Sequence, residues 1–196
     1  MSRFTAIRAA SMALKALLER HITDTADPHV GGVEISLSSP RELRSDTPTT
    51  AVSLWLYQVE RNAELLNQPR RRTESDTELH RPFPLNLLYL VTPLAQQTLR
   101  EHALMGRILQ VFHSSPIVDP RSLLDPADLA ELFALRISFQ PLSLEELTRV
   151  WDALKEPYQL SASYLIQLVQ IDSLLEADRV SPVIHSDLRV GVAESA

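Results

Sequence analysis

The sequence has no cysteine and little glycine, and each shortage excludes whole classes of site. Without a thiol, the 196 residues cannot form a disulfide, a cysteine nucleophile or a zinc site built on thiolates. A loop that cradles phosphate needs glycines close together, because its backbone approaches the anion in unusual conformations. The four glycines are scattered at Gly31, Gly32, Gly106 and Gly191. They exclude a P-loop and a dinucleotide-binding fingerprint.

The chain also lacks an excess of positive charge and an amino-terminal hydrophobic run long enough to span a membrane. Its formal net charge is -6 and its sequence pI is about 5.5, so the molecule as a whole should not attract nucleic acid or an anionic membrane. Arg8, Lys15 and Glu19 interrupt the apolar amino-terminal segment, which therefore predicts neither a signal peptide nor a membrane span. We expect a cytoplasmic protein with no nucleic-acid partner and no membrane partner.

What is present fits one globular domain. Hydrophobic residues make up 44% of the chain and charged residues 22%, which is the composition of a domain with a substantial core. The predicted fold class is α/β (α+β), with a mixed, largely antiparallel sheet of about five strands flanked by three helices. We assign residues 1–180 to this domain and 181–196 to a carboxy-terminal tail, where 180–192 could add an edge strand.

Three helices are predicted from apolar residues at helical spacing, at about 2–21, at about 96–114 and from 143 to 157. Gly106 weakens the second helix, so we expect close backbone packing there. The third helix has the clearest start, because Ser143 and Glu146 have the spacing of a capping box. Its buried face should comprise Leu144, Leu147, Val150, Trp151 and Leu154.

Strands are predicted where apolar residues alternate with polar ones or run continuously. The segment Pro84 to Ala95 is almost continuously apolar between prolines. Its length and its β-branched and aromatic content favour a central strand over a helix, although periodicity alone fits both. The segment 51–59 predicts a strand covered on both faces. We expect the strands near 33–37 and 51–59 to pair antiparallel, joined by a polar loop over 39–49. The other predicted strands lie at 135–139 and 164–172.

A polar, irregular segment of about twenty residues, roughly 60–82, joins two strong strands. A connection of that length is either functional or disordered. It contains Arg70, Arg71 and Arg72, which are the main concentration of positive charge. These arginines fit a solvated loop, and they also fit an arm that contacts an acidic partner surface through bidentate pairs with carboxylates. Nucleic-acid backbone is a weaker alternative, because aromatic stacking residues are missing nearby.

The candidates for catalysis all have simpler explanations. His29 lies near Asp24 and Asp27, a conceivable metal loop, but solvated turn residues give the same pattern. The paired carboxylates Asp125 and Asp128 are explained by the start of a helical turn. We therefore expect no catalytic residue, no metal, no cofactor and no enzyme activity, although a hydrolase with a site scattered in sequence stays open as an alternative.

Several segments, taken together and in order, resemble a known family. They are VSLWLYQVERNAELLNQPRRR, RPFPLNLLYLVTPLA, EHALMGRILQVFHSSPIV, ISFQPLSLEELTRVWDAL and PYQLSASYLIQLVQIDS. The chain resembles the Pvc16 N-terminal domain family, also known as DUF4255, over about Ser2 to Ser173.

The resemblance implies a cap, or tail terminator, of a phage-tail-like contractile injection system. Such caps form a six-membered ring at the end distal to the baseplate, where they close the inner tube and hold the last ring of the sheath. The implied partners are therefore sheath and inner-tube proteins and further copies of the chain, which would be a structural protein with a tail-terminator-like fold.

On this reading the partner contacts should come from the long arm. We assign them to Arg61, Asn62, Arg70, Arg71 and Arg72. The alternative function is a non-enzymatic adaptor or nucleic-acid-binding module that uses the Arg70–Arg72 part of the arm.

Overall fold

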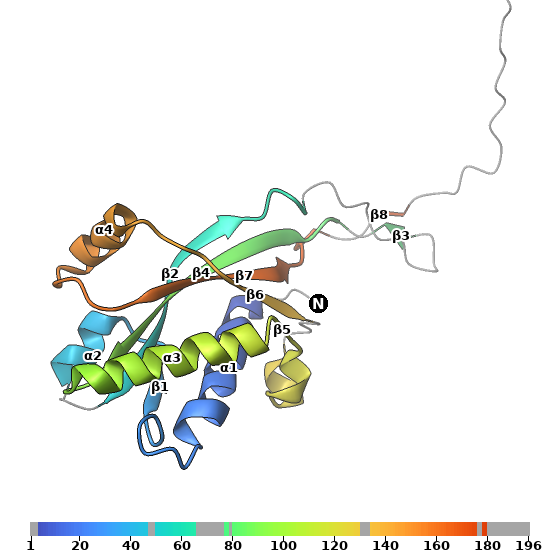
Figure 1. Cartoon of the computed structure of the whole chain (residues 1–196). Coiled ribbons are helices and arrows are strands. Elements are labelled where there is room, and N and C mark those ends of the chain that lie inside the picture. Colours follow the sequence, from blue (N-terminus) through green and yellow to red (C-terminus); the bar gives the residue numbers. More distant parts are fainter. Residues whose placement is uncertain are drawn as a thin grey trace, which may run out of the picture.

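The computed structural model describes residues 4–46, 50–65, 77–78, 80–129, 134–175 and 178–179. Within these ranges six strands form one mixed sheet in the order β1-β2-β4-β7-β6-β5 (Figure 1). The strands are β1 (Glu34–Ser36), β2 (Ala51–Arg61), β4 (Phe83–Leu94), β5 (Ile117–Val118), β6 (Leu135–Phe139) and β7 (Ala162–Ile171). Two further strands, β3 (Thr77–Glu78) and β8 (Asp178–Arg179), form a separate two-stranded sheet. The predicted mixed fold is confirmed, with one strand more in the main sheet than expected.

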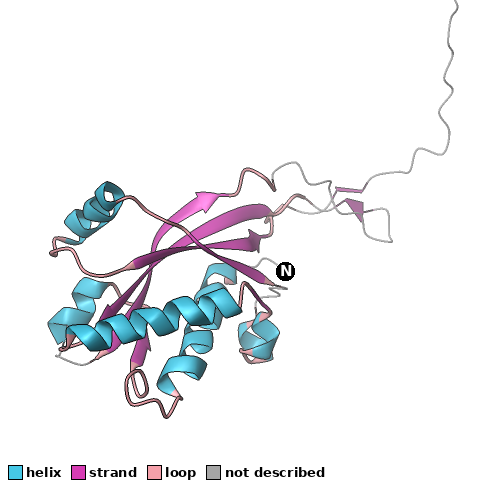
Figure 2. Cartoon of the chain, in the orientation of Figure 1, coloured by secondary structure: helices cyan, strands magenta, loops and turns pink. Residues whose placement is uncertain are grey.

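Helices lie on both faces of the main sheet (Figure 2). Residues of α1 and α3 form the larger core cluster on one face, and residues of α4 form a smaller cluster on the other. The helices are α1 (Ala6–Leu18), α2 (Pro40–Asp46), α3 (Thr98–Ser114) and α4 (Leu144–Leu154), and a π-helical turn over Glu19–Thr23 continues α1. The two long helices predicted from periodicity are thus present, with α1 beginning four residues later than expected.

Strand β4 is the central strand that its apolar sequence predicts. It pairs antiparallel with β2 on one side and with β7 on the other. Leu87, Tyr89 and Val91 point to the core under α1 and α3, whereas Leu90 packs in the cluster under α4. Because successive side chains of a strand point to opposite faces, a strand covered twice must be apolar throughout. The continuous run is the consequence of that double burial.

The predicted antiparallel pairing of the first two strands is wrong. Glu34, Ile35 and Ser36 pair in parallel with Ala51, Val52 and Ser53. The cause is α2, which occupies most of the segment predicted to be a polar loop. A parallel pair needs a crossover connection, and a helix is its usual form. The start of α2 carries its own capping motif: Ser39 Oγ and its backbone N–H both donate to the Glu42 carboxylate, at 3.0 and 2.8 Å.

The close packing expected at Gly106 is also wrong. Gly106 is exposed on α3, and a Cβ at this position would meet no atom within 4 Å among the described residues. The glycine therefore lowers the stability of the helix without any contact that requires it. Helix α3 tolerates it because Leu104, Ile108 and Phe112 anchor the buried side.

Helix α4 begins with the predicted capping box. The Glu146 backbone N–H donates to Ser143 Oγ at 3.2 Å, and the Ser143 backbone N–H donates to the Glu146 carboxylate at 2.8 Å. The hydrogen bonds that the backbone N–H and the Oγ of Ser143 donate to this carboxylate lower the pKa of Glu146 below its ordinary value. Trp151 is buried as expected, but Leu144 is 69% exposed, so its assignment to the buried face is wrong. Leu144 occupies the first turn, which lies outside the contact with the sheet.

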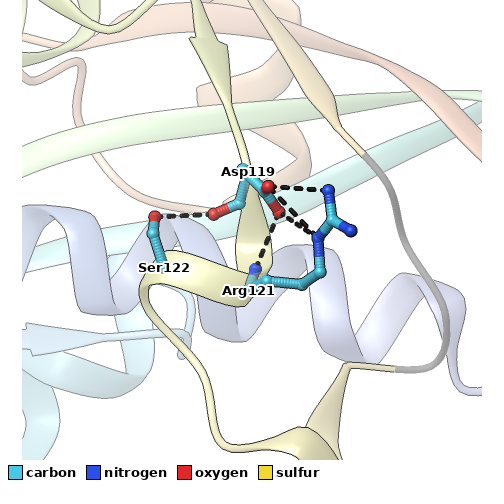
Figure 3. A network of polar contacts seen from close by, with 3 residues as sticks. All are labelled: Asp119, Arg121 and Ser122. Atoms are coloured by element: carbon cyan, nitrogen blue, oxygen red, sulfur yellow. Dashed lines mark hydrogen bonds and ion pairs between the residues drawn. The ribbon is translucent and has the colours of Figure 1, made fainter.

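A polar turn follows the short edge strand β5. The Asp119 carboxylate accepts the backbone N–H of Arg121 at 3.0 Å and pairs with the Arg121 guanidinium at 2.8 Å (Figure 3). Ser122 Oγ donates to the Asp119 carbonyl oxygen at 2.7 Å. An ion pair of 2.7 Å between Arg8 and Asp128 joins the end of this segment to α1. The first contacts fix the turn locally, and the Arg8–Asp128 ion pair connects the segment to α1.

Candidate partner-binding surface

The strands β2, β4 and β7 continue past the helices toward the two-stranded β3–β8 sheet (Figure 1). We call this part of the sheet the distal end; it comprises residues 59–61, 83–85 and 169–171. Its outer residues are less covered than the rest of the same strands: Val59 is 46% exposed and Phe83 is 48% exposed. Large apolar side chains with that exposure, next to a long arm, mark the distal end as a candidate contact surface.

Two irregularities of the sheet precede the distal end. The register of β2 against β4 shifts between Leu56 and Gln58. The register of β7 against β4 shifts near Leu168, whose φ of 70° is unusual for any residue other than glycine. A β-bulge bends its strand and increases the local twist. The two irregularities lie at the base of the distal end, where Leu85 and Val169 are still buried in the larger core while Val59 and Phe83 are about half exposed.

Asn62 fixes the base of the arm. Its backbone N–H donates to the Pro84 carbonyl oxygen at 3.0 Å, and its side-chain Nδ2 donates to Asn86 Oδ1 at 2.9 Å. Its Oδ1 accepts the backbone N–H groups of Glu64 and Leu65 at 3.0 and 3.3 Å. The residue is only 2% exposed. A contribution of Asn62 to partner binding would therefore act by positioning the arm, since its amide is already used inside the domain.

Arg61, the neighbour of Asn62, points outward and is exposed. Its guanidinium carbon lies 5.7 Å from the centroid of the Phe83 ring. A cation over an aromatic face is held in position while its N–H groups stay available to acceptors. Phe83 gave no functional signal in the sequence, because one aromatic residue before a proline is an ordinary strand start. The structure shows that it supports the arginine.

The remaining predicted contact residues, Arg70, Arg71 and Arg72, lie outside the described residues. Further along the arm, Thr77 and Glu78 pair antiparallel with Arg179 and Asp178. The arm thus meets the segment that follows β7, a contact that no sequence pattern predicted because each strand has only two residues. The arm has a second attachment besides the β2 and β4 strands.

Ionisable side chains elsewhere in the domain make contacts that connect elements of the fold. Asp27 accepts the backbone N–H of His29 at 2.9 Å and pairs with Arg107 at 3.3 Å, so its carboxylate joins a turn to α3. Within the described ranges, no three His, Asp or Glu side chains are grouped to hold a metal ion. Burial raises the pKa of Tyr89 to about 12, and its hydroxyl lies 2.7 Å from Ser11 Oγ in the core. Asp27 and Tyr89 therefore have structural roles, since each contacts a residue of another element.

In the part of the chain that the structure describes, no helix is both long enough and apolar enough to span a membrane.

The fold and the order of segments agree with known proteins. The family model described as the Pvc16 N-terminal domain matches residues 9–184. Two solved structures are similar to the chain. One is the sheath/tube terminator, in the extended state, of the extracellular contractile injection system PVC, with a TM-score of 0.67, 18% identity and coverage of 97% of this chain. The other is the tube-terminating cap of the anti-feeding prophage, with a TM-score of 0.59, 17% identity and coverage of 91%.

The match extends over only part of those proteins. This chain corresponds to 65% of the length of the first and 59% of the length of the second, so each is longer than the region it shares with this fold. No curated protein sequence matches the chain.

Proposed function

The chain belongs to the Pvc16 N-terminal domain family, and from this premise we propose that it is the structural cap of a contractile injection system. In this role it ends polymerisation of the inner tube and the sheath at the end distal to the baseplate. The observation that carries the proposal is the common fold over 97% of this chain with a protein described as a sheath/tube terminator.

A terminator must satisfy the open contacts of the last tube and sheath subunits without offering the same contacts onward. The domain is suited to this because its parts differ in exposure. Helices cover both faces of the central strands, whereas the distal end leaves Val59 and Phe83 exposed beside the arm. In the proposed role the partner binds at the distal end, and the helix-covered strands do not offer a second surface of the same kind. No enzyme activity is part of the proposed role.

We assign the contacts with tube or sheath to the distal end and its arm, through Arg61 and through Arg70 to Arg72, with Asn62 as the residue that positions the arm. Arginine suits such contacts because its planar fork pairs bidentately with carboxylates. The exposure of Arg61 over the Phe83 ring supports the assignment.

The proposal includes the oligomer and its place in the cell. Copies of the chain form a ring of six, as the family resemblance implies. The particle assembles in the cytoplasm. A closed ring saturates its own lateral interfaces, which leaves only the faces toward tube and sheath to bind.

Particle length tests the function. Particles assembled from the tube, sheath and baseplate proteins of the same system should have a narrow length distribution when this chain is present. In its absence, the distribution measured by electron microscopy should broaden and extend to longer tubes. Equal distributions with and without the chain would exclude a terminator role.

The arm assignment needs its own variant. Reversal of three charges, R70E/R71E/R72E, should weaken capping and broaden the length distribution while the circular dichroism spectrum stays unchanged. The matched control is the conservative variant R70K/R71K/R72K, which keeps the charge. Normal particle length and sheath attachment with the reversed arm would show that the arginines do not make the contact.

A further inference from the structure

An apolar groove lies near the β6–β5 edge of the main sheet, between the end of α3 and strand β6. Its volume is about 600 Å³, and it is open to solvent on one side. Leu109, Gln110 and His113 of α3 form one wall, Phe139 of β6 forms the other, and Phe112 and Tyr164 line it from the core. Phe139 is 56% exposed although its ring packs against Tyr164 with centroids 5.6 Å apart. The groove therefore presents a large apolar side chain that this chain only partly covers.

The backbone of β6 is also open beside the groove. Gln140 donates to Ser163 of β7, and Ile137 donates to Pro116 at the start of β5, so the backbone groups of odd-numbered β6 residues point away from β7. Strand β5 consists of two residues only, and its pairs reach from Leu135 to Arg136. Beyond them the chain turns into α3. Among the described residues, the outward backbone groups of Phe139 have no strand beside them, and an added strand would satisfy them.

The carboxy-terminal sequence has the pattern of a strand that covers an apolar surface. From Val180 to Val192, the even-numbered residues are Val180, Pro182, Ile184, Ser186, Leu188, Val190 and Val192. All but Ser186 are apolar. The odd-numbered positions are Ser181, Val183, His185, Asp187, Arg189 and Gly191, so Val183 is the one large apolar residue among them. Alternation with a period of two places one apolar face opposite one polar face, which suits a strand that is half buried.

We propose that the groove binds residues 180–192 of a second copy of this chain, as a strand added beside β6. Their even-numbered side chains enter the groove, and their backbone pairs with the free edge at Phe139. The inference deepens the proposed function, since it supplies the lateral contact of the ring. A donor segment on one copy and an acceptor groove on the next form a heterologous interface, which closes into a ring when the rotation between copies permits.

The position of β8 favours a neighbouring copy over the same copy as the donor. Residues 178 and 179 pair with the arm, and the β3–β8 sheet projects past the distal end of the main sheet (Figure 1). The groove lies farther back, beside Tyr164, and Ile171 at the distal end is about 23 Å along β7 from that residue. A strand of the same chain would have to turn back over this whole length. A strand that continued in the outward direction of β8 would instead lead away from the groove of its own copy.

Cysteine cross-linking tests the proposal directly, because the natural chain has no cysteine to interfere. A full-length acceptor copy carries Gln110→Cys, and a tagged full-length donor copy carries a single cysteine at one of positions 188 to 192. After mixing and mild oxidation, the covalent dimer is measured on a non-reducing gel. We expect at least a fivefold higher yield from Leu188→Cys, Val190→Cys and Val192→Cys than from Arg189→Cys and Gly191→Cys.

Two kinds of control test whether the cross-link depends on the groove. An acceptor with Leu99→Cys carries its thiol on the same helix but outside the groove, at a residue that is 81% exposed, and should give only background yield. Phe139→Glu should lower the yield at Gln110→Cys about fivefold, while Phe139→Leu should preserve it. Circular dichroism confirms that both variants are folded.

Other outcomes overturn the inference. Equal yields at odd and even donor positions, or a yield no higher than with Leu99→Cys, would exclude strand addition in the groove. A copy carrying both Gln110→Cys and Val190→Cys that forms only an internal disulfide, with no covalent oligomers, would make the same chain the donor. Particle length separates the two proposals. Normal capping without cross-links leaves the cap role standing, whereas cross-links without any effect on length leave the strand contact standing.

Discussion

The middle and the distal end of strands β2 and β4 differ in what covers them. In the middle Leu90 lies under Trp151 and Leu154 of α4, and each of these side chains is at most 7% exposed. At the distal end the same strands carry Val59 and Phe83, which are about half exposed, and the arm begins there. The strands thus have a covered part, whose packing stabilises the fold, and a partly exposed part, to which we assign partner binding. Substitutions in the covered part should therefore cost stability, and those at the distal end should cost function.

The largest effect on stability is expected from Trp151→Ala. Trp151 is 1% exposed and its ring packs against Tyr158, with centroids 6.4 Å apart. Removal of a buried indole leaves a cavity and should lower the free energy of unfolding by about 3–5 kcal/mol. Urea denaturation measures the change. The matched control on the same helix is Leu144→Ala, where an exposed side chain is removed and the expected change is below about 0.5 kcal/mol. Equal losses would show that α4 is not anchored by its buried face.

The second largest effect is expected from Asn62→Ala at the junction of the two regions. The substitution leaves the backbone N–H groups of Glu64 and Leu65 without their acceptor and should cost about 1–3 kcal/mol. Hydrogen exchange should increase at 62–65 and near Asn86, and not under α4. Asn62→Asp keeps the acceptor for these N–H groups but removes the donor to Asn86 and buries a carboxylate, so it should also lose stability. Faster exchange throughout the domain would contradict a local role.

A smaller effect is expected from the capping box of α4. Ser143→Ala removes the acceptor for the Glu146 backbone N–H and should cost about 1 kcal/mol of stability. Ser39→Ala at the start of α2 provides the parallel case in a shorter helix. Thermal unfolding followed by circular dichroism would measure both. No change in either variant would mean that the packing of the helices, and not their caps, fixes where they begin.

The same cap predicts a pH dependence. Hydrogen bonds from Ser143 lower the pKa of Glu146 from its ordinary value of 4.5. Since the pKa is lower in the folded state, the charged carboxylate stabilises the domain at neutral pH, and this contribution is lost as the pH falls below about 4.5 through the folded-state pKa. The difference in stability between the natural chain and Glu146→Gln should therefore shrink with acidification. A difference that grows at low pH would contradict this assignment.

The smallest effect on stability is expected at the distal end. Arg61→Ala removes an exposed guanidinium from the Phe83 ring and should change the free energy of unfolding by about 0.5 kcal/mol. The same variant should broaden the length distribution of assembled particles, while Arg61→Lys should do so less. A large loss of stability with normal particle length would reverse the roles that the comparison assigns to the two regions.

The sequence predicted the covered part of the fold well because its signals are strong there. The apolar run of β4 follows from burial on two faces, and the capping box at Ser143 is observed with both of its hydrogen bonds. The same Ser-x-x-Glu spacing occurs at Ser39, with Pro40 at the first helical position, but the segment is too short and polar for apolar periodicity to indicate a helix. The predicted pairing of β1 and β2 is wrong for the same reason, since a parallel pair depends on the connecting helix.

The candidate site was less predictable. Arg61 and Asn62 are neighbours in a polar segment, and nothing in their residue types says that one is exposed and the other 2% exposed. Their difference arises from the hairpin, in which Asn62 turns toward Pro84 and Asn86 on a strand more than twenty residues away. The pairing of β3 with β8 joins segments about a hundred residues apart through two residues each. Such contacts leave no periodic pattern in the sequence.

The most direct measurement of the central claim is the position of the chain on an assembled particle. A tagged copy that supports normal assembly can be labelled and its location recorded by electron microscopy, with particle length measured in the same images. The account predicts label at one end only, opposite the baseplate, on particles of uniform length. Label along the sheath or at the baseplate, or particles of normal length that carry no label, would contradict a role as the terminating cap.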